Sequence, residues 1–187
     1  MRITGGECCG RPIKVPAGDR VRPTQDRVRS ALFSMLAELV PGARVLDLFA
    51  GSGAVGLEAV SRGAAESVWV EADRRHVVII QENVRALGAT GRVVCDDSLR
   101  WLRRAEEAPF DLVFADPPYD WAQQHGFAGI ADVLRTRMLL RERGILVVEQ
   151  PSELPAAALP AWECLRDRAY GHTRLVVYRL LDAGTQS

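Results

Sequence analysis

The sequence lacks an excess of charge of either sign, because 24 Lys and Arg residues balance 24 Asp and Glu residues in a chain of 187. This balance excludes a protein that is basic over its whole surface, as an indiscriminate nucleic-acid binder would be. No apolar run approaches the roughly 18 residues that a membrane span requires. The N-terminus, MRITGGECCG, is not the basic segment and apolar core of a signal peptide. We therefore expect a cytoplasmic protein without a membrane partner.

Metal-ligand spacing is also absent. The chain has three histidines without ligand spacing and four cysteines without a C-x-x-C pair, namely Cys8, Cys9, Cys95 and Cys164. We expect reduced cysteines and no metal. What the sequence does have is an ordinary globular composition, with 48% hydrophobic and 26% charged residues. That composition and length favour one substantial core.

Short apolar runs alternate with helix-length amphipathic segments from about residue 44 onward. The apolar runs are 44–49, 67–72, 91–95, 110–115 and 144–150. The amphipathic segments between them are 53–62, 74–87, 98–107 and roughly 122–141. Near-continuous apolar strands separated by helices are typical of a parallel sheet covered on both faces. The pattern predicts an open, doubly wound α/β fold of the Rossmann-like type.

The C-terminal part departs from this alternation. Two further runs, 162–170 and 173–180, flank the turn Gly171-His172 and predict an antiparallel hairpin at the sheet edge. The proline-rich stretch from Pro151 to Pro160 would connect the fifth strand to this hairpin. Together the runs predict a mostly parallel sheet of seven strands.

The first 43 residues have a different pattern. Residues 1–15 place glycines between short alternating stretches and predict a small hairpin outside the main sheet. A helix should follow, with Thr24 as its N-cap and Pro41-Gly42 as its end. Its predicted apolar face consists of Val28, Ala31, Leu32, Met35, Leu36 and Leu39. We expect residues 1–20 to be an N-terminal extension and residues 21–187 to be the main domain.

A glycine loop follows the first predicted strand. It reads Asp47-Leu48-Phe49-Ala50-Gly51-Ser52-Gly53, and its glycines allow a sharp turn and the close approach of a ligand to the backbone. The loop matches G-x-G-x-x-G, and Glu71 ends the second strand, where an acid can accept hydrogen bonds from ribose hydroxyls. These features alone are compatible with a dinucleotide dehydrogenase.

Asp47 favours another cofactor. A carboxylate in an otherwise apolar strand is costly to bury without partners, and it would repel a pyrophosphate. S-adenosylmethionine carries a positively charged amino group and a sulfonium, so an acid at this place favours it. Asp96-Asp97-Ser98 ends the third strand and opens the next helix, and an acid at this edge could meet an adenine amino group. The predicted cofactor-binding residues are Asp47, Phe49, Gly51, Ser52, Gly53, Glu71, Asp97 and Ser98.

The fourth strand ends in Asp116-Pro117-Pro118-Tyr119, the predicted catalytic tetrapeptide. Two prolines fix the backbone and remove two N–H donors, which leaves a rigid loop rich in acceptors. Acceptance of both hydrogens of a nucleobase amine, by the Asp116 carboxylate and the Pro117 carbonyl, favours localisation of the nitrogen lone pair for attack on a methyl group. Tyr119 offers a flat surface on which an extruded base can stack.

These motifs resemble those of the RsmD family of bacterial 16S rRNA guanine-N2 methyltransferases. The resemblance rests on the glycine loop, Glu71, Asp97, Asp116-Pro-Pro-Tyr, the leading Met-Arg-Ile-Thr-Gly-Gly and the segment Arg22-Pro-Thr-Gln-Asp-Arg-Val-Arg29, and it covers essentially the whole chain. It implies a class I methyltransferase fold and methylation of guanine 966 with S-adenosylmethionine as donor. The implied partner is the small ribosomal subunit, 30S, or its assembly intermediate, and a monomer is expected.

The charge distribution is compatible with an RNA substrate. Residues 1–30 contain seven basic and three acidic residues. The predicted RNA-contacting residues are Arg2, Arg11, Lys14, Arg20, Arg22, Arg27 and Arg29. Arg27 and Arg29 could instead cover the cofactor cleft. Two other functions remain open at this point: an adenine-N6 methyltransferase acting on DNA or RNA, and a non-catalytic RNA-binding or assembly factor.

Overall fold

The computed structural model describes residues 1–16 and 23–181. The chain forms two compact units, Met1–Ser98 and Leu99–Ser187. The expected boundary between residues 1–20 and 21–187 lies among residues 17–22, outside the described part of the chain.

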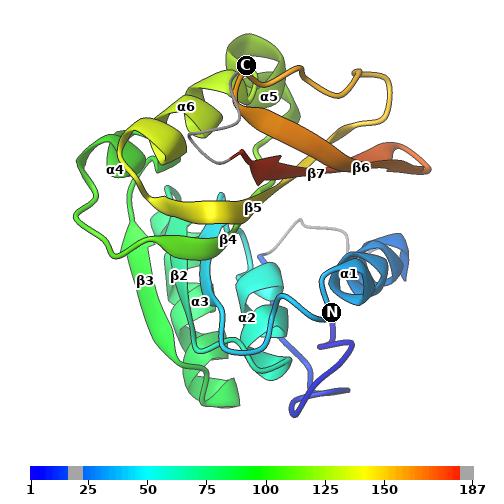
Figure 1. Cartoon of the computed structure of the whole chain (residues 1–187). Coiled ribbons are helices and arrows are strands. Elements are labelled where there is room, and N and C mark those ends of the chain that lie inside the picture. The colour runs from blue at the N-terminus through cyan, green and yellow to red at the C-terminus, as the bar shows by residue number, and fades with distance from the viewer. Residues whose placement is uncertain (17–22, 182–187) are drawn as a thin grey trace. The chain divides into compact units, whose positions relative to one another are not determined.

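Three parallel strands form the sheet of the first unit, in the order β3-β2-β1. They are β1 (Arg44–Leu48), β2 (Glu66–Glu71) and β3 (Gly91–Cys95). Helix α2 (Ala54–Ser61) connects β1 to β2, and α3 (Arg74–Leu87) connects β2 to β3 (Figure 1). The alternation of apolar runs and amphipathic segments therefore predicted these βαβ connections correctly, with boundaries within one residue for the strands.

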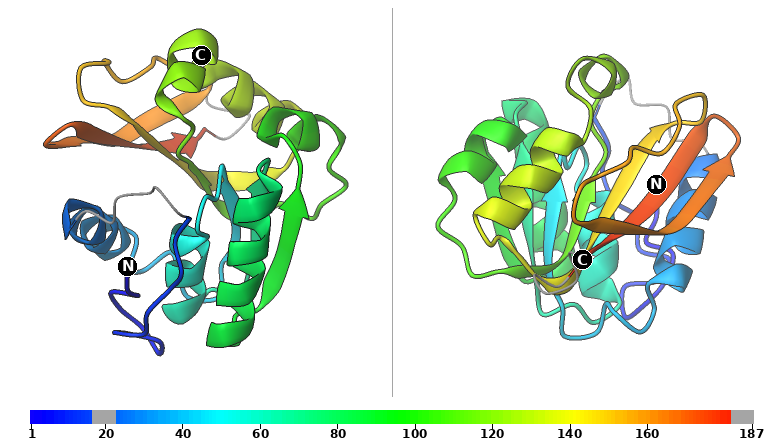
Figure 2. Two further views of the ribbon diagram at one scale, coloured as in Figure 1. Left: turned by 180° about the vertical axis from the view of Figure 1, so that it is seen from behind. Right: turned by 45° about the horizontal axis from the view of Figure 1, so that its top comes forward.

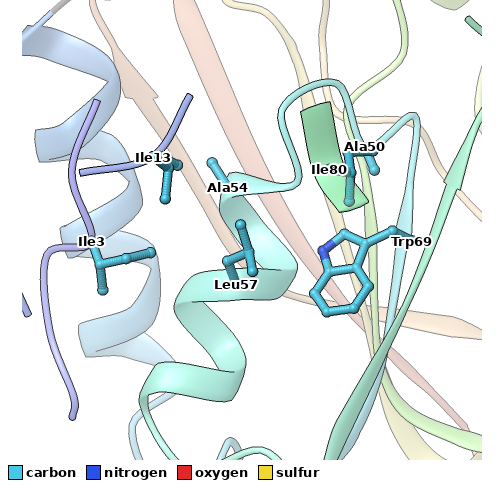
Figure 3. Close-up of a cluster of buried hydrophobic side chains, with 7 residues drawn as sticks. All are labelled: Ile3, Ile13, Ala50, Ala54, Leu57, Trp69 and Ile80. Carbon is cyan, nitrogen blue, oxygen red and sulfur yellow. The ribbon is translucent and has the colours of Figure 1, made fainter. Parts of the chain in front are cut away.

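The two connecting helices are buried to different extents, for reasons visible in their sequences. Helix α3 is amphipathic: Asp73 caps its first turn by accepting a hydrogen bond from the Arg75 N–H at 2.8 Å, and Gly88 ends it in the left-handed conformation. Helix α2 is apolar nearly all round, as a helix buried on two sides must be. Figure 3 shows Ile3 and Ile13 of the N-terminal segment on one side of α2 and Trp69 of β2 on the other.

The N-terminal segment forms a looser structure than the expected hairpin. Arg2 and Pro12 make a single antiparallel bridge. Glu7 donates its backbone N–H to the Ser61 carbonyl at 2.7 Å, at the end of α2. A Cβ on Gly6 would lie 1.8 Å from that same carbonyl oxygen, so this docking requires glycine. The residues between Arg2 and Pro12 therefore pack on α2 and do not extend a strand ladder.

Helix α1 spans Pro23–Met35, which corrects the expected ends. The helix begins at Pro23, whose fixed φ and missing N–H suit a first helical position, so Thr24 lies inside the helix and is not its N-cap. Turns replace the helix after Met35, well before Pro41. Of the expected apolar face, Met35 and Leu39 are exposed, whereas Val28, Leu32 and Leu36 are buried.

The second unit contains four strands in the order β4-β5-β7-β6. They are β4 (Phe110–Ala115), β5 (Leu140–Pro151), β6 (Trp162–Tyr170) and β7 (Thr173–Leu180). Strand β5 is parallel to β4 and antiparallel to β7, and β5, β7 and β6 lie side by side in Figure 2. The expected hairpin is confirmed at both ends, and the proline-rich stretch is its connection.

The helices of the second unit are shorter than expected. Helix α4 spans Ser98–Arg104, starting at the last residue of the first unit, and the helix expected over 122–141 is two helices, α5 (Tyr119–His125) and α6 (Ala128–Thr136). Gly126 separates them with φ 60°, a conformation that ends a helix readily when the residue is glycine. The remainder of the expected helix belongs to β5, which begins at Leu140.

Across residues 1–16 and 23–181, no helix is long and apolar enough to cross a membrane. The same residues contain no cluster of three potential metal ligands.

Candidate functional site

The candidate cofactor-binding site lies in the first unit, at the turn from β1 into α2. Phe49, Gly51 and Gly53 adopt positive φ values of 59°, 55° and 78°. For Phe49 this conformation costs about 1–2 kcal/mol, since its Cβ crowds the following carbonyl. Ser98 helps to hold it, because the Phe49 N–H donates to the Ser98 Oγ at 3.3 Å. The loop is therefore fixed in a strained conformation, as is common where backbone must approach a ligand.

Asp47 lies beneath this loop and is only 4% exposed. Its Oδ2 accepts a hydrogen bond from the Gly56 N–H in α2 at 2.9 Å. Burial raises the pKa of Asp47 to about 7, the Gly56 hydrogen bond partly opposes this, and the nearby charge of Glu71 adds to it. A cation bound beside Asp47 would relieve both unfavourable contributions.

Glu71 joins the ends of the first two strands. Its Oε2 accepts from the Gly51 N–H at 2.8 Å, and its Oε1 accepts from the Asp73 N–H at 2.8 Å. The carboxylate is thus held by backbone donors on both sides, while each oxygen keeps acceptor capacity for a further donor such as a ribose hydroxyl. The prediction that Gly51 and Glu71 act together at one site agrees with this hydrogen bond.

The end of β3 adds two acids and a hydroxyl. Asp96 is buried, and its Oδ1 accepts from the Asp97 N–H at 2.9 Å. Asp97 is half-buried, which leaves part of its side chain open to a ligand. Ser98 is buried against the loop, where it accepts the Phe49 N–H. Asp96 thus orients the turn that presents Asp97.

The glycine loop itself leaves room for a ligand. A Cβ at Gly51 would meet no atom within 4 Å, whereas a Cβ at Gly53 would lie 3.0 Å from Ile80 and one at Gly56 2.3 Å from the Trp69 Nε1. Gly53 and Gly56 are therefore packing requirements, and Gly51 is the position where the backbone is open. This open backbone and the carboxylates of Asp47, Glu71 and Asp97 fit a positively charged, ribose-containing cofactor.

Asn83 of α3 also contributes to this site, although it was not among the predicted site residues. Its Oδ1 accepts from the Lys14 N–H at 2.8 Å, and its Nδ2 donates to the carbonyls of Lys14 at 2.9 Å and Ser52 at 3.0 Å. This buried amide joins the N-terminal segment to the glycine loop. The signal in the sequence was an amide among the apolar positions of the predicted helix 74–87.

A separate candidate base-binding pocket lies in the second unit, at the carboxyl end of β4. Asp116, Pro117 and Tyr119 line a small pocket with residues of β5 and β7, whereas Pro118 is exposed and lies outside its lining. Tyr119 opens α5, is 54% exposed, and donates its hydroxyl to the His172 carbonyl at 3.4 Å. Its hydroxyl is thus anchored, while about half of the residue remains exposed to solvent.

Glu149 of β5 lines the same pocket, and it too was not among the predicted site residues. Burial raises its pKa to about 7, and a hydrogen bond from the Thr173 hydroxyl partly opposes this. The signal in the sequence was an acid near the carboxyl end of the fifth apolar run, as Asp47 and Asp116 lie near the carboxyl ends of the first and fourth.

The predicted RNA-contacting residues divide into three groups. Arg2, Arg11, Lys14 and Arg27 are exposed. Arg20 and Arg22 lie outside the described residues. Arg29 is only 5% exposed, which is at odds with the RNA contact expected for it.

Arg29 is buried because it belongs to an ion-pair cluster centred on Glu58 of α2. The Glu58 carboxylate receives hydrogen bonds from Arg29 Nε at 3.1 Å and Arg62 Nε at 2.8 Å, and from the N–H and hydroxyl of Thr4 at 2.8 and 2.7 Å. Arg29 also donates to the Arg2 carbonyl. The cluster joins α1, α2 and the N-terminal segment, so Arg29 stabilises the fold that carries the exposed basic residues.

Comparison with known proteins places this arrangement in a family. A family model described as Conserved hypothetical protein 95 matches residues 1–179. The Ribosomal RNA small subunit methyltransferase D of Escherichia coli K12 is 36% identical over all of this chain and 91% of its own length. The protein of the same name from Haemophilus influenzae is 31% identical, with 96% of this chain and 92% of its own covered.

Solved structures agree with the expected fold. The structure of yhhF from Escherichia coli matches with a TM-score of 0.84 at 34% identity, covering 97% of this chain and 98% of its own. The Thermus thermophilus protein TTHA0928 matches with a TM-score of 0.77 at 38% identity, covering 95% and 98%. The class I methyltransferase fold is confirmed, and the dehydrogenase that the glycine loop alone allowed is excluded. Since both the family model and full-length relatives span the described site, the chain belongs to the RsmD family of S-adenosylmethionine-dependent rRNA methyltransferases.

Proposed function

We propose that this protein transfers a methyl group from S-adenosylmethionine to the exocyclic N2 amine of a guanine in 16S rRNA, in the cytoplasm and as a monomer. The proposed substrate is the small ribosomal subunit or its assembly intermediate, and the proposed base is guanine 966, as the family resemblance implies. The observation that carries the proposal is the Asp116-Pro117-Pro118-Tyr119 turn, which leaves β4 and lines a pocket with an acid, a proline and an exposed aromatic ring.

The first unit supplies the cofactor residues. S-adenosylmethionine, when bound, supplies an electrophilic methyl group on a positively charged sulfur. Glu71 and the open backbone at Gly51 would hold the ribose, Asp97 the adenine amine, and Asp47 the positive charge. The charged form of the buried Asp47 carboxylate is costly without a cation nearby. The cofactor-binding residues of the first unit should therefore favour a cationic ligand over a phosphate.

The second unit supplies the residues that act on the base. The amine of a nucleobase is a weak nucleophile because its lone pair is delocalised into the ring. The Asp116 carboxylate accepts one amine hydrogen and the Pro117 carbonyl accepts the other, which favours a localised lone pair aimed away from both acceptors. After attack, the amine proton held by the Asp116 carboxylate passes to that carboxylate and from there to solvent. Stacking on the exposed Tyr119 would hold a base that has left the RNA stack.

The exposed basic residues of the first unit position the RNA. Arg2, Arg11, Lys14 and Arg27 can make phosphate contacts that carry no sequence information, so the pocket must select the base. Arg29 is not part of this surface. Neutral net charge is compatible with this division, because basic residues outnumber acidic ones by seven to three in residues 1–30, and acidic residues are in excess in the rest of the chain.

Methylation of isolated subunits tests the proposal. Purified protein and labelled S-adenosylmethionine should modify small subunits from a strain that lacks the enzyme, and digestion to nucleosides should yield N2-methylguanosine. N6-methyladenosine would favour an adenine methyltransferase instead. Cofactor binding without incorporation would favour a non-catalytic assembly factor.

A pair of variants tests the role of the tetrapeptide. Asp116→Ala should abolish transfer but keep cofactor affinity within about tenfold, or about 1.4 kcal/mol. Asp120→Ala is the matched control, since Asp120 is an exposed acid in the first turn of α5 and does not line the pocket. Loss of cofactor binding in Asp116→Ala would contradict its assignment to the base.

A further inference from the structure

The pocket of the second unit contains a second acid besides Asp116. Glu149 projects from β5, next to Asp116 and Tyr119 in the pocket lining, and its neighbour across the antiparallel ladder is β7. The tetrapeptide accounts for recognition of an amine but not for recognition of the rest of the base. Glu149 is the titratable pocket residue to which the proposed transfer reaction gives no role.

The contacts of Glu149 leave its carboxylate able to accept further hydrogen bonds. The hydroxyl of Thr173 in β7 donates to its carboxylate. No ion pair to Glu149 occurs within residues 1–16 and 23–181; Arg174, on the next position of β7, pairs with Asp167 at 2.6 Å. Gln150, the next residue of β5, turns away and donates to the carbonyls of Leu154 and Pro155. The carboxylate therefore keeps acceptor capacity that the fold does not use.

Purines that carry an amine differ at the atom beside it. In guanine the ring nitrogen next to the N2 amine, N1, carries a hydrogen and is a donor. In adenine the ring nitrogen next to the N6 amine carries a lone pair and is an acceptor. A carboxylate placed beside the amine-binding acceptors gains a charge-assisted hydrogen bond from guanine and faces a lone pair in adenine.

We propose that Glu149 is the residue that selects guanine, by accepting the N1–H of the base whose N2 amine Asp116 and Pro117 hold. This inference rests on the proposed transfer to a guanine amine and adds the basis of its specificity. Two acids in one pocket would then read the two adjacent donors of guanine, and Tyr119 would supply stacking that is indifferent to base identity.

The protonation state of Glu149 sets the conditions of a test. Burial raises its pKa to about 7, the Thr173 hydroxyl lowers it, and Asp116 is the other acid of the pocket. A protonated Glu149 could donate to a ring lone pair and would discriminate poorly. Assays are therefore made at least one pH unit above that value, where the carboxylate predominates.

Replacing the target base in the RNA distinguishes the role of Glu149 from that of Asp116. RNA substrates that carry guanine or 2,6-diaminopurine at the target position both have the C2 amine, but the second has a lone pair at N1. The natural protein should prefer guanine by roughly a hundredfold in kcat/KM, as expected when one charge-assisted hydrogen bond in a buried site cannot form. Glu149→Gln should reduce this preference below about tenfold, since an amide can accept from one base or donate to the other.

Two controls keep the inference falsifiable. Glu149→Asp retains a carboxylate and should keep the preference at a lower rate, and Thr173→Val should keep it because the carboxylate remains. An unchanged preference in Glu149→Gln, equal use of both bases by Glu149→Asp, or loss of transfer to both bases in Glu149→Gln with normal cofactor affinity would overturn the inference alone. Failure of the natural protein to methylate the C2 amine of either base would instead overturn the proposed function.

Discussion

Replacing Asp47 by asparagine should make the protein more stable and a poorer cofactor binder at the same time. Asp47 is 4% exposed and accepts a hydrogen bond from the Gly56 N–H, which asparagine Oδ1 can also accept. Its raised pKa means that the folded protein disfavours the charged form. The substitution removes that charge while it keeps the size of the side chain.

The magnitude follows from the two pKa values. The difference between the ordinary value of 3.8 and about 7 in the folded protein corresponds to roughly 4 kcal/mol. Because the folded pKa is the higher one, stability is lost as pH rises from about 4 to about 7 and stays low above that range. Asp47→Asn should therefore gain about 4 kcal/mol at pH 8 or higher, about 2 kcal/mol near pH 5, and nothing where Asp47 is protonated in both states.

Urea unfolding across this pH range, together with calorimetric binding of S-adenosylmethionine, measures both effects. The variant should bind the cationic cofactor at least tenfold more weakly above pH 7, or about 1.4 kcal/mol. Asp73→Asn is the matched control: hydrogen bonds from Arg75 hold the pKa of Asp73 below its usual range, so this variant should lose stability at neutral pH. The reasoning would be refuted by a variant that gains no stability at high pH, or by one that binds the cofactor normally.

Two further predictions concern the N-terminal half. Glu58→Ala should lower the free energy of unfolding by about 3–5 kcal/mol in urea titrations, because it leaves Arg29 buried without its main partner. The control variant Glu66→Ala should lower it by less than about 1 kcal/mol, because the ion pair of Glu66 with Arg44 is more exposed. An equal decrease in both variants would contradict the structural role of the cluster. The double variant Arg11→Ala and Arg27→Ala should weaken RNA binding and leave cofactor affinity unchanged. The slope of log Kd against log salt concentration should decrease by about one for each phosphate that the protein no longer neutralises. RNA affinity equal to that of the natural protein in filter binding at several salt concentrations would exclude these residues from the RNA surface.

Local sequence signals predicted much of the fold because the strands are short and nearly continuously apolar. The strands β1, β2, β3 and β4 lie within one residue of their predicted ends, and the hairpin ends match. The prediction of one helix over 122–141 was wrong, because amphipathic spacing continues across Gly126 although its backbone conformation does not. Helix α1 begins at its proline and ends at Met35, and the turn that follows it is exposed except for Leu36 and Val40, which are buried in the core.

The candidate site was predictable where function depends on neighbours in sequence. The glycine loop and the tetrapeptide are local backbone devices, so a strand followed by glycines or prolines is enough to find them. Asn83, Glu58 and Glu149 could not be assigned in the same way. Each acts on groups distant in the chain: Asn83 on Lys14 and Ser52, Glu58 on Thr4 and Arg29, and Glu149 on Thr173.

The sequence by itself determined the fold class, the family and the two local motifs, because these depend on apolar periodicity and on the conformations that glycine and proline allow. Only the tertiary structure decided which charged residues are available for function. Arg27 and Arg29 are equivalent in the sequence, two positions apart on one helix. One is exposed and the other is buried on Glu58, because a helix turns by about 200° over two residues and presents them on opposite faces.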